Sequence, residues 1–371
     1  MSAPEFSKNI GHILVVGGCG FLGHHIVDML VGRHSESTIS VLDLRTNSNR
    51  NPSPQVSYHE GDITDECAMG ALFAKLKPDI VIHTASPHAM AKDDVLYKVN
   101  VDGTKALLKA AQENAVKAFV YTSSASVVFN WDTGLINADE RWPIIAGKKQ
   151  KEYYTSTKAW AEVAVLEANR KPASFLTCAI RPAGIFGEGD VQTLPNIVVI
   201  GQRGSARYQL GPNENLFDFT YVKNIAHGHL LAANALVATH AMAPTVPLDS
   251  EKVDGEAFFI TNDSPVYFWD FMRTVWKHAG VQIPMKKVWA FSPEFSLLVA
   301  SLSEWYAWFK GQKPALTRER AKYSYMTRYY SVDKARLRLG YKPLVGLEEG
   351  IKRGVADVLE TQKQEAEKKS Q

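Results

Sequence analysis

The first half of the chain alternates between two patterns of apolar residues. Short runs in which apolar, mostly branched residues dominate occupy positions 13–16, 38–42, 55–60, 79–83, 118–122 and 174–180. The stretches between them carry apolar residues at helical spacing. We expect a helix that ends at residue 75, and further helices at about 97–114, 155–169 and 222–236. Strands that alternate with helices predict an α/β fold with a doubly wound parallel sheet. In such a sheet the ligand lies outside the carboxyl ends of the strands.

Three glycines, Gly17, Gly20 and Gly23, follow the first strand and precede its helix. Glycines let backbone N–H groups approach a pyrophosphate, and the helix N-terminus adds partial positive charge. Asp43 closes the next strand, twenty residues after Gly23, where an acid would bind a ribose hydroxyl. This arrangement predicts a dinucleotide-binding unit of the Rossmann type.

The regular alternation of predicted strands and helices stops after residue 187. We expect a dinucleotide-binding domain over residues 8–187, with residues 216–262 returning to it. Residues 188–215 and 263–355 are less regular and partly aromatic, and we expect them to form a smaller, C-terminal substrate-binding cap. Residues 356–371 form a polar tail, whose last dozen residues we expect to be frayed.

Composition excludes several classes of protein. The 371 residues are 45% apolar and 22% charged, with a net charge of +3, too small to indicate nucleic-acid binding. Three scattered cysteines predict neither a disulfide framework nor a metal site. The first nine residues lack the apolar core of a signal peptide. The sequence contains no uninterrupted run of eighteen apolar residues, so we expect no membrane-spanning helix.

Tyr154 and Lys158 are four residues apart, so on a helix their side chains share one face. A phenol has a reference pKa near 10, and a neighbouring ammonium favours its ionised form. Tyr154 can then accept the proton of an alcohol while a hydride leaves the same carbon. Ser124, at a strand end, can hold the substrate oxygen, whereas Tyr153 would point away. The chemistry predicted is that of an oxidoreductase.

These motifs resemble those of the extended short-chain dehydrogenases. The resemblance rests on 16–23, on Gly61-Asp62-Ile63-Thr64-Asp65, on Asn100-Val101-Asp102-Gly103-Thr104, on the Tyr154/Lys158 pair and on 181–187. Within them, 121–129 and 215–222 look like the 3β-hydroxysteroid dehydrogenase branch, and most of all like its fungal members that act on sterol 4α-carboxylates. The resemblance implies NAD-dependent oxidation of a 3β-hydroxyl and loss of the C4 carboxylate as carbon dioxide, in the C4 demethylation of sterol (ergosterol) biosynthesis.

The resemblance also implies the residues of the site. Ser124, Tyr154 and Lys158 would be catalytic, Asp62 would bind the adenine edge, and Lys158 would also hold the nicotinamide ribose. The other cofactor contacts implied are Gly17, Gly20, Phe21, Leu22, Gly23, Asp43, Ile63, Thr84, Ala85, Ser86, Asn100, Thr122, Tyr154 and Pro182. NAD is the expected cofactor, and NADP stays open because Arg45 follows Asp43 closely.

Three alternatives remain at this point: another 3β-hydroxysteroid dehydrogenase, a nucleotide-sugar epimerase or dehydratase of the same fold, and a non-enzymatic dinucleotide sensor. A sterol carboxylate needs a cation, and the sequence does not choose among Lys148, Lys149, Lys151, Arg203, Arg207 and Lys223.

Residues 292–310 carry a separate signal. Phe295, Leu298, Leu302, Trp305, Tyr306 and Phe309 fall on one helical stripe flanked by lysines, which predicts peripheral contact with a membrane; packing against the cap is the alternative. The resemblance implies the cytosolic face of the endoplasmic reticulum. A homodimer, and a C4-demethylation complex with a sterol methyl oxidase and a 3-keto reductase, are further partner predictions.

Overall fold

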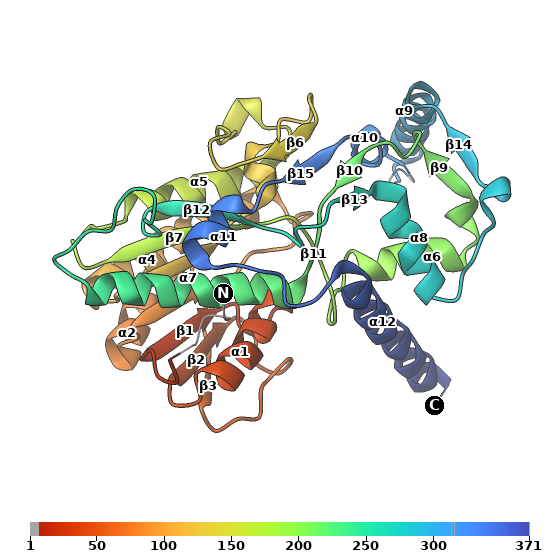
Figure 1. The fold of residues 1–371 in the computed structure, drawn as a ribbon. Helices are drawn as coiled ribbons and strands as arrows, with labels where there is room; N and C mark the ends of the chain where they lie inside the picture. The colour runs from red at the N-terminus through yellow and green to blue at the C-terminus, as the bar shows by residue number, and fades with distance from the viewer. Residues whose placement is uncertain (1–6, 313, 315, 371) are drawn as a thin grey trace.

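The computed structural model describes residues 7–312, 314 and 316–370. Its largest sheet has seven strands in the order β12-β7-β5-β4-β1-β2-β3 (Figure 1). Every neighbouring pair is parallel, which confirms the predicted sheet. The bounds are β1 His12–Val16, β2 Thr38–Asp43, β3 Val56–Glu60, β4 Ile80–His83, β5 Ala118–Thr122, β7 Leu176–Pro182 and β12 Glu256–Ile260.

Helices cover both faces of this sheet because its strands are apolar on both sides. Along β1, Ile13 and Val15 belong to one core and Leu14 and Val16 to the other, and all four are fully buried. The first core is covered by α1 (Phe21–Arg33) and α7 (Val222–Ala241), which pack together, and by α11 (Asp333–Leu339). The second is covered by α2 (Glu66–Leu76), α4 (Thr104–Glu113) and α5 (Tyr153–Glu167).

The helix expected at 97–114 is built from three consecutive segments. These are α3 (Asp93–Tyr97), a π-helical stretch η1 (Lys98–Gly103) and α4. A π-helical stretch inside a helix is rare and is frequent at functional sites. Asn100 lies in this stretch and is buried, so the irregular winding positions one of the predicted cofactor residues.

The cap elements gather at the side of the molecule away from the large sheet (Figure 1). They include α6 (Leu194–Gln202), α8 (Phe268–His278), α9 (Pro293–Lys310), α10 (Arg318–Tyr323) and the paired strands β9 (Tyr208–Leu210) and β14 (Trp289–Phe291). Short 3-10 turns occur at Ala125–Val128, Gly147–Lys149, Ser205–Arg207 and Met285–Lys287.

Two small sheets lie between the large sheet and the cap. One has four strands in the order β13-β10-β15-β6, and the other pairs β11 with β8. Their bounds are β6 Leu135–Ala138, β8 Gly184–Phe186, β10 Leu216–Phe217, β11 Phe219–Tyr221, β13 Val266–Tyr267 and β15 Arg328–Tyr330. Asp218 separates β10 from β11: its N–H donates to the carbonyl of Arg328, and its Oδ2 accepts from Tyr330 N at 2.8 Å.

The prediction of a frayed C-terminus is wrong within the described residues, because α12 runs from Leu347 to Ser370. Ile351, Val355 and Val358 bury one face of its first half. The polar residues beyond are good helix formers, and Gln364 donates to Glu360 one turn earlier. Among the described residues, no helix is long and apolar enough to cross a membrane.

Candidate active site

The glycine loop has the close backbone approach that a pyrophosphate requires. Gly17 has φ +82°, and a Cβ there would lie 2.6 Å from the backbone N of Ala85. A Cβ on Gly23 would lie 2.0 Å from the carbonyl oxygen of Gly17. Gly20 caps α1, so Phe21 and Leu22 form its first turn. The glycines therefore let the loop pack closely on itself and on Ala85 as it leads into the N-terminus of α1, the kind of helix start that binds phosphates.

Asp43 at the end of β2 is tied to this loop. Its Oδ2 accepts from Cys19 N at 3.0 Å, and Asn49 donates to the Cys19 carbonyl at 2.9 Å. One carboxylate oxygen is thus used to order the loop, and Oδ1 has no hydrogen bond to the described residues. Arg45 is exposed. This geometry leaves an acceptor beside the loop, where a ribose hydroxyl would lie.

The residues that follow β3 and β4 belong to the expected cofactor site. Asp62 accepts from Thr64 N at 2.9 Å, and Ile63 is buried where a Cβ on Gly103 would lie 2.7 Å from it. Thr84 and Ala85 both donate to the carbonyl of Val16, at 2.9 Å and 3.1 Å. The exit of β4 is therefore bonded directly to the glycine loop.

Lys158 is buried against β5. Its ammonium donates to the carbonyl of Thr122 and lies 4.6 Å from the centre of the Tyr121 ring. Burial lowers the pKa of Lys158 to about 7. The hydroxyl of Thr122 is bonded in turn to Nε2 of His229 at 2.8 Å, and Nδ1 of this imidazole is bonded to the Ile225 carbonyl. Helix α7 thus braces the strand end that holds the lysine, a role that the sequence analysis missed.

Tyr154 is connected to a buried polar network. Burial raises the pKa of its phenol, and a hydrogen bond with Ser86 acts to lower it. Ser86 donates to Asn100, and Asn100 donates to Thr157, both at 2.9 Å. The sequence predicts Lys158 as the group that favours the phenolate. In the structure that ammonium donates to the Thr122 carbonyl, and burial keeps the pKa of the Tyr154 phenol raised although its hydrogen bond with Ser86 acts in the opposite direction.

The predicted site residues come from strand ends that meet at one edge of the sheet. Ser124 follows β5, is half-buried, and accepts from Ser126 N at 3.1 Å. Pro182 ends β7. Tyr153 is exposed and packs edge-on against Trp160, as expected for the tyrosine that points away. Among the described residues, no three His, Cys, Asp or Glu side chains cluster as metal ligands.

The six cations considered for the substrate carboxylate are either paired with another carboxylate or exposed to solvent. Lys151 pairs with Asp132, and Lys223 pairs with Glu188 at 2.9 Å. Lys148, Lys149, Arg203 and Arg207 are exposed. Among the described residues, none of the six forms a hydrogen bond or an ion pair with Ser124 or Ser126.

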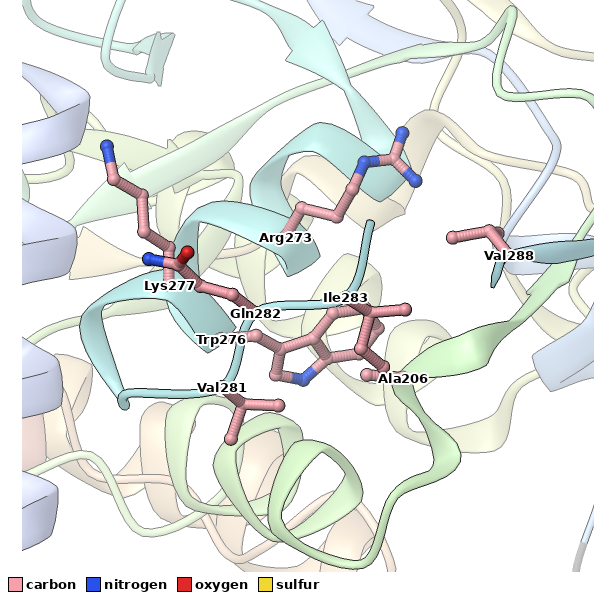
Figure 2. Close-up of a pocket in the computed structure, with 8 residues that line it drawn as sticks. All are labelled: Ala206, Arg273, Trp276, Lys277, Val281, Gln282, Ile283 and Val288. Carbon is pink, nitrogen blue, oxygen red and sulfur yellow. The ribbon is translucent and has the colours of Figure 1, made fainter. Parts of the chain in front are cut away.

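A pocket of about 280 Å³ lies in the cap, apart from these residues (Figure 2). It is lined by Ala206, Arg273, Trp276, Lys277, Val281, Gln282, Ile283 and Val288. The indole of Trp276 donates to the carbonyl of Ile197 at 2.8 Å, and Arg273 binds Gln209 and Asp270. No predicted site residue reaches this pocket, whose polar groups hold the cap together.

Comparison with known proteins identifies the family. The sequence profile of the 3-beta hydroxysteroid dehydrogenase/isomerase family matches residues 14–292. The chain belongs to this family. Among the similar members, the decarboxylating sterol-4-alpha-carboxylate 3-dehydrogenase of Schizosaccharomyces pombe is 41% identical over 347 residues, which are 93% of this chain and 96% of that protein. The human enzyme of the same name is 34% identical over 351 residues, with 92% and 86% of the two chains covered.

Solved structures show that this 3β-hydroxysteroid dehydrogenase family member has the extended short-chain dehydrogenase fold. A UDP-glucose 4-epimerase from Thermotoga maritima superimposes with a TM-score of 0.68 at 20% identity, covering 95% of this chain and 99% of that one. A dTDP-glucose 4,6-dehydratase from Bacillus anthracis, solved with NAD, gives 0.68 at 16% identity, with 95% and 97% covered. At such identities the likeness concerns the fold alone.

Proposed function

We propose that this chain is an NAD-dependent sterol-4α-carboxylate 3-dehydrogenase that also decarboxylates its product. The observation that carries the proposal is the presence of Ser124, Tyr154 and Lys158 at one edge of the sheet in a chain whose nearly full-length relatives bear this name. The proposed place in metabolism is the removal of a C4 methyl group during sterol synthesis.

The cofactor part of the proposal rests on the glycine loop and Asp43. The loop offers backbone N–H groups, and at Gly17 and Gly23 a Cβ would collide with Ala85 or with the loop itself. Asp43 offers an acceptor for a ribose hydroxyl. NAD, when bound, supplies the acceptor for a hydride. Lys158, Thr122 and Ser86 lie on the elements that would border its nicotinamide end.

The chain's own residues handle the substrate oxygen and its proton. Ser124 donates a hydrogen bond to the 3β-oxygen, and Tyr154 accepts its proton as the C3–H bond breaks. The resulting ketone lies next to the carbon that bears the carboxylate. When the bond to the carboxylate carbon breaks, its electron pair moves into the ketone and carbon dioxide leaves. Ser124 and the now protonated Tyr154 donate to the oxygen where negative charge develops.

The decisive experiment mixes purified protein, NAD and a 4α-carboxysterol. We expect reduced cofactor and carbon dioxide in equal amounts. The matched control is the same 3β-hydroxysterol without the carboxyl group. Cofactor reduction with no release of carbon dioxide would favour another 3β-hydroxysteroid dehydrogenase. Inactivity on both sterols, with turnover of a nucleotide sugar, would favour an epimerase or dehydratase.

We also propose that α9 contacts a membrane surface. The face that packs inward is made of small residues, Ser296, Ala300 and Ala307, all buried. The large residues point outward and are between 48% and 79% exposed: Phe295, Leu298, Leu302, Trp305, Tyr306, Trp308 and Phe309. Burying so many aromatic groups requires a partner.

A lipid bilayer fits this surface best. Tryptophan and tyrosine favour the level of the headgroups, and Lys286, Lys287 and Lys310, which flank or end α9 in the sequence, favour anionic lipids. A substrate that is almost insoluble in water gives a reason for entry from a membrane, which we propose to be the cytosolic face of the endoplasmic reticulum.

Co-sedimentation with liposomes containing phosphatidylserine tests this contact. A Phe295/Leu302/Trp305→Ser variant should lose most of its binding. An Ile136/Val191/Leu337→Ser variant, which removes equally exposed apolar residues elsewhere, should sediment as the parent does. Equal sedimentation of both folded variants would rule out α9 as the contact.

A further inference from the structure

Trp131 has a backbone conformation that a large side chain rarely adopts. Its φ is +67°, in the left-handed region that favours glycine. Among the described residues, no other aromatic residue has such a φ. Residues held in this region are strained, and they persist where the surrounding structure fixes them, most often at functional sites. A strained tryptophan therefore points to a role for its ring.

The turn that contains this tryptophan is fixed by its own residues and by the segment that precedes α5. Asn130 Oδ1 accepts from the backbone N–H of Asp132 at 2.9 Å. Gln150 donates to the carbonyl of Phe129 at 2.8 Å, and Lys151 forms an ion pair with Asp132. These contacts hold the turn against the start of the helix that carries the predicted base.

The same turn lies close to the serine that is expected to hold the substrate hydroxyl. Ser124 caps the 3-10 turn Ala125–Val128, and Phe129 ends it. A 3-10 turn of four residues is about 8 Å long, which is less than the length of the four fused rings of a sterol. A sterol whose 3β-oxygen is bound at Ser124 therefore has its rings within reach of Phe129 and Trp131.

Aromatic rings adjoin Trp131 without covering it. Its ring centre lies 5.1 Å from that of Phe129, which is buried, and 6.0 Å from that of Tyr323 on α10. Trp131 itself stays partly exposed. The tryptophans that pack the cap, Trp269 and Trp276, donate their indole N–H groups to backbone carbonyls at 2.8 Å. Within the part of the chain that the structure describes, the indole N–H of Trp131 has no such acceptor. Its ring is held by apolar contacts and keeps surface to offer a ligand.

Tyr323 connects this turn to the helix that is proposed to contact a membrane. Its helix, α10, packs against α9. Glu304 of α9 accepts twice from Arg318 of α10, from the backbone N–H at 2.8 Å and from Nε at 2.7 Å. α9, α10 and Trp131 thus form a continuous series of contacts that leads from the exposed aromatic stripe toward Ser124.

We propose that the indole of Trp131 is the surface on which the ring system of the sterol packs, which makes it a specificity-determining residue. This inference rests on the proposed function. An indole offers a large apolar surface, and the rings of a sterol carry few polar groups by which they could be recognised otherwise. The contact involves rings that do not react, so it stabilises the substrate and the transition state equally. Loss of the indole should therefore raise KM and leave kcat unchanged.

The test removes the indole at a position that suits glycine. Trp131→Gly relieves the strain at φ +67° and deletes the ring, and Trp131→Asn deletes the ring with a residue that tolerates the same φ. NAD is kept saturating and the 4α-carboxysterol is varied in one detergent. We expect KM to rise at least about 10-fold in both variants, the scale of one lost aromatic contact, and kcat to stay within about 2-fold. Trp131→Phe should recover part of the loss. The matched control is Trp142→Ala, at another tryptophan that is 37% exposed, and it should behave as the parent does.

The outcomes separate this inference from the proposed function. Parent protein that does not oxidise the acid would overturn the proposed function, and this inference with it. With an active parent, a folded Trp131→Gly whose KM stays within about 2-fold of the parent's would overturn the role of Trp131 alone. A fall in kcat at unchanged KM would mark a structural tryptophan and overturn that role too. Loss of folding in both ring-deleted variants, measured by thermal unfolding, would have the same meaning.

Discussion

At the scale of single residues, the site is a set of buried polar groups that hold one another. Lys158 is fixed by a backbone carbonyl, and Tyr154 is fixed through Ser86, Asn100 and Thr157. Buried hydrogen bonds of this kind keep side chains in one rotamer, so the base is preorganised for its proton.

The first prediction concerns the base. Tyr154→Phe keeps the ring and removes the proton acceptor, so turnover of the 4α-carboxysterol should fall by at least ~10²-fold. NAD affinity, measured by titration, should change little. Near-normal turnover by the variant would show that another group takes the proton.

The second prediction concerns Ser86. Burial raises the pKa of the Tyr154 phenol, and its hydrogen bond with Ser86 opposes that rise; the oxidation needs the phenolate. In Ser86→Ala that pKa should rise, and the ascending limb of the pH–rate profile should move to higher pH. Thr46→Ala, a change at an exposed hydroxyl bonded to Glu60, is the control. A profile of Ser86→Ala that overlays the parent's would contradict the assignment.

The third prediction concerns the cofactor. Asp43 beside the glycine loop should repel the 2′-phosphate of NADP, because the like charges would lie close together. Competing titrations should give tighter binding of NAD, and Asp43→Asn should narrow the difference. Tighter binding of NADP by the parent would mean that Arg45 dominates.

At the scale of elements, sequence patterns predicted those parts whose shape depends on local residues. The strands of the large sheet and the glycine loop follow from short apolar runs and from glycine spacing. β13 and β15 are two or three residues long and exist because distant strands pair with them, so no local pattern marks them. The hydrogen bond between Arg328 and Ser126 could not be predicted for the same reason, because 202 residues separate the two along the chain.

The end of helix α12 is predicted wrongly for another reason: its polar residues indicate a frayed tail, whereas the structure continues the helix to Ser370. Its buried residues end near Leu359, and the exposed turns that follow add little packing. Deletion of residues 363–371 should therefore leave the melting temperature within about 2 °C of the parent, well below the shift produced by a lost core contact. A large drop in calorimetry would show that the terminal turns stabilise the molecule.

At the scale of the whole molecule, buried histidines make the fold sensitive to acid. Burial lowers the pKa of His25, His227 and His229 to about 4 and that of His83 to about 3. The unfolded chain binds these protons near pH 6.5. The free energy of unfolding is therefore greatest above that pH and falls as the pH drops from about 6.5 to about 4.

Burial raises the pKa of Asp218 to about 7 and also raises the pKa of Glu140 and Asp190, so these three carboxyl groups act in the opposite direction to the four histidines. Thermal unfolding of the cofactor-free protein should give a clearly lower melting temperature at pH 5.0 than at pH 7.5. His229→Gln should make the difference smaller. A melting temperature that holds or rises on acidification would contradict this account.

The four-stranded sheet has a consequence for the order in which the protein matures during synthesis. Its strands come from residues 135–138, 216–217, 266–267 and 328–330, so Arg328 cannot donate to Ser126 until nearly the whole chain has left the ribosome. The glycine loop and the first strands, by contrast, are local and are made first. A growing chain can thus assemble its glycine loop long before β15 completes the four-stranded sheet beside Ser126, and this side of the site is the last to form.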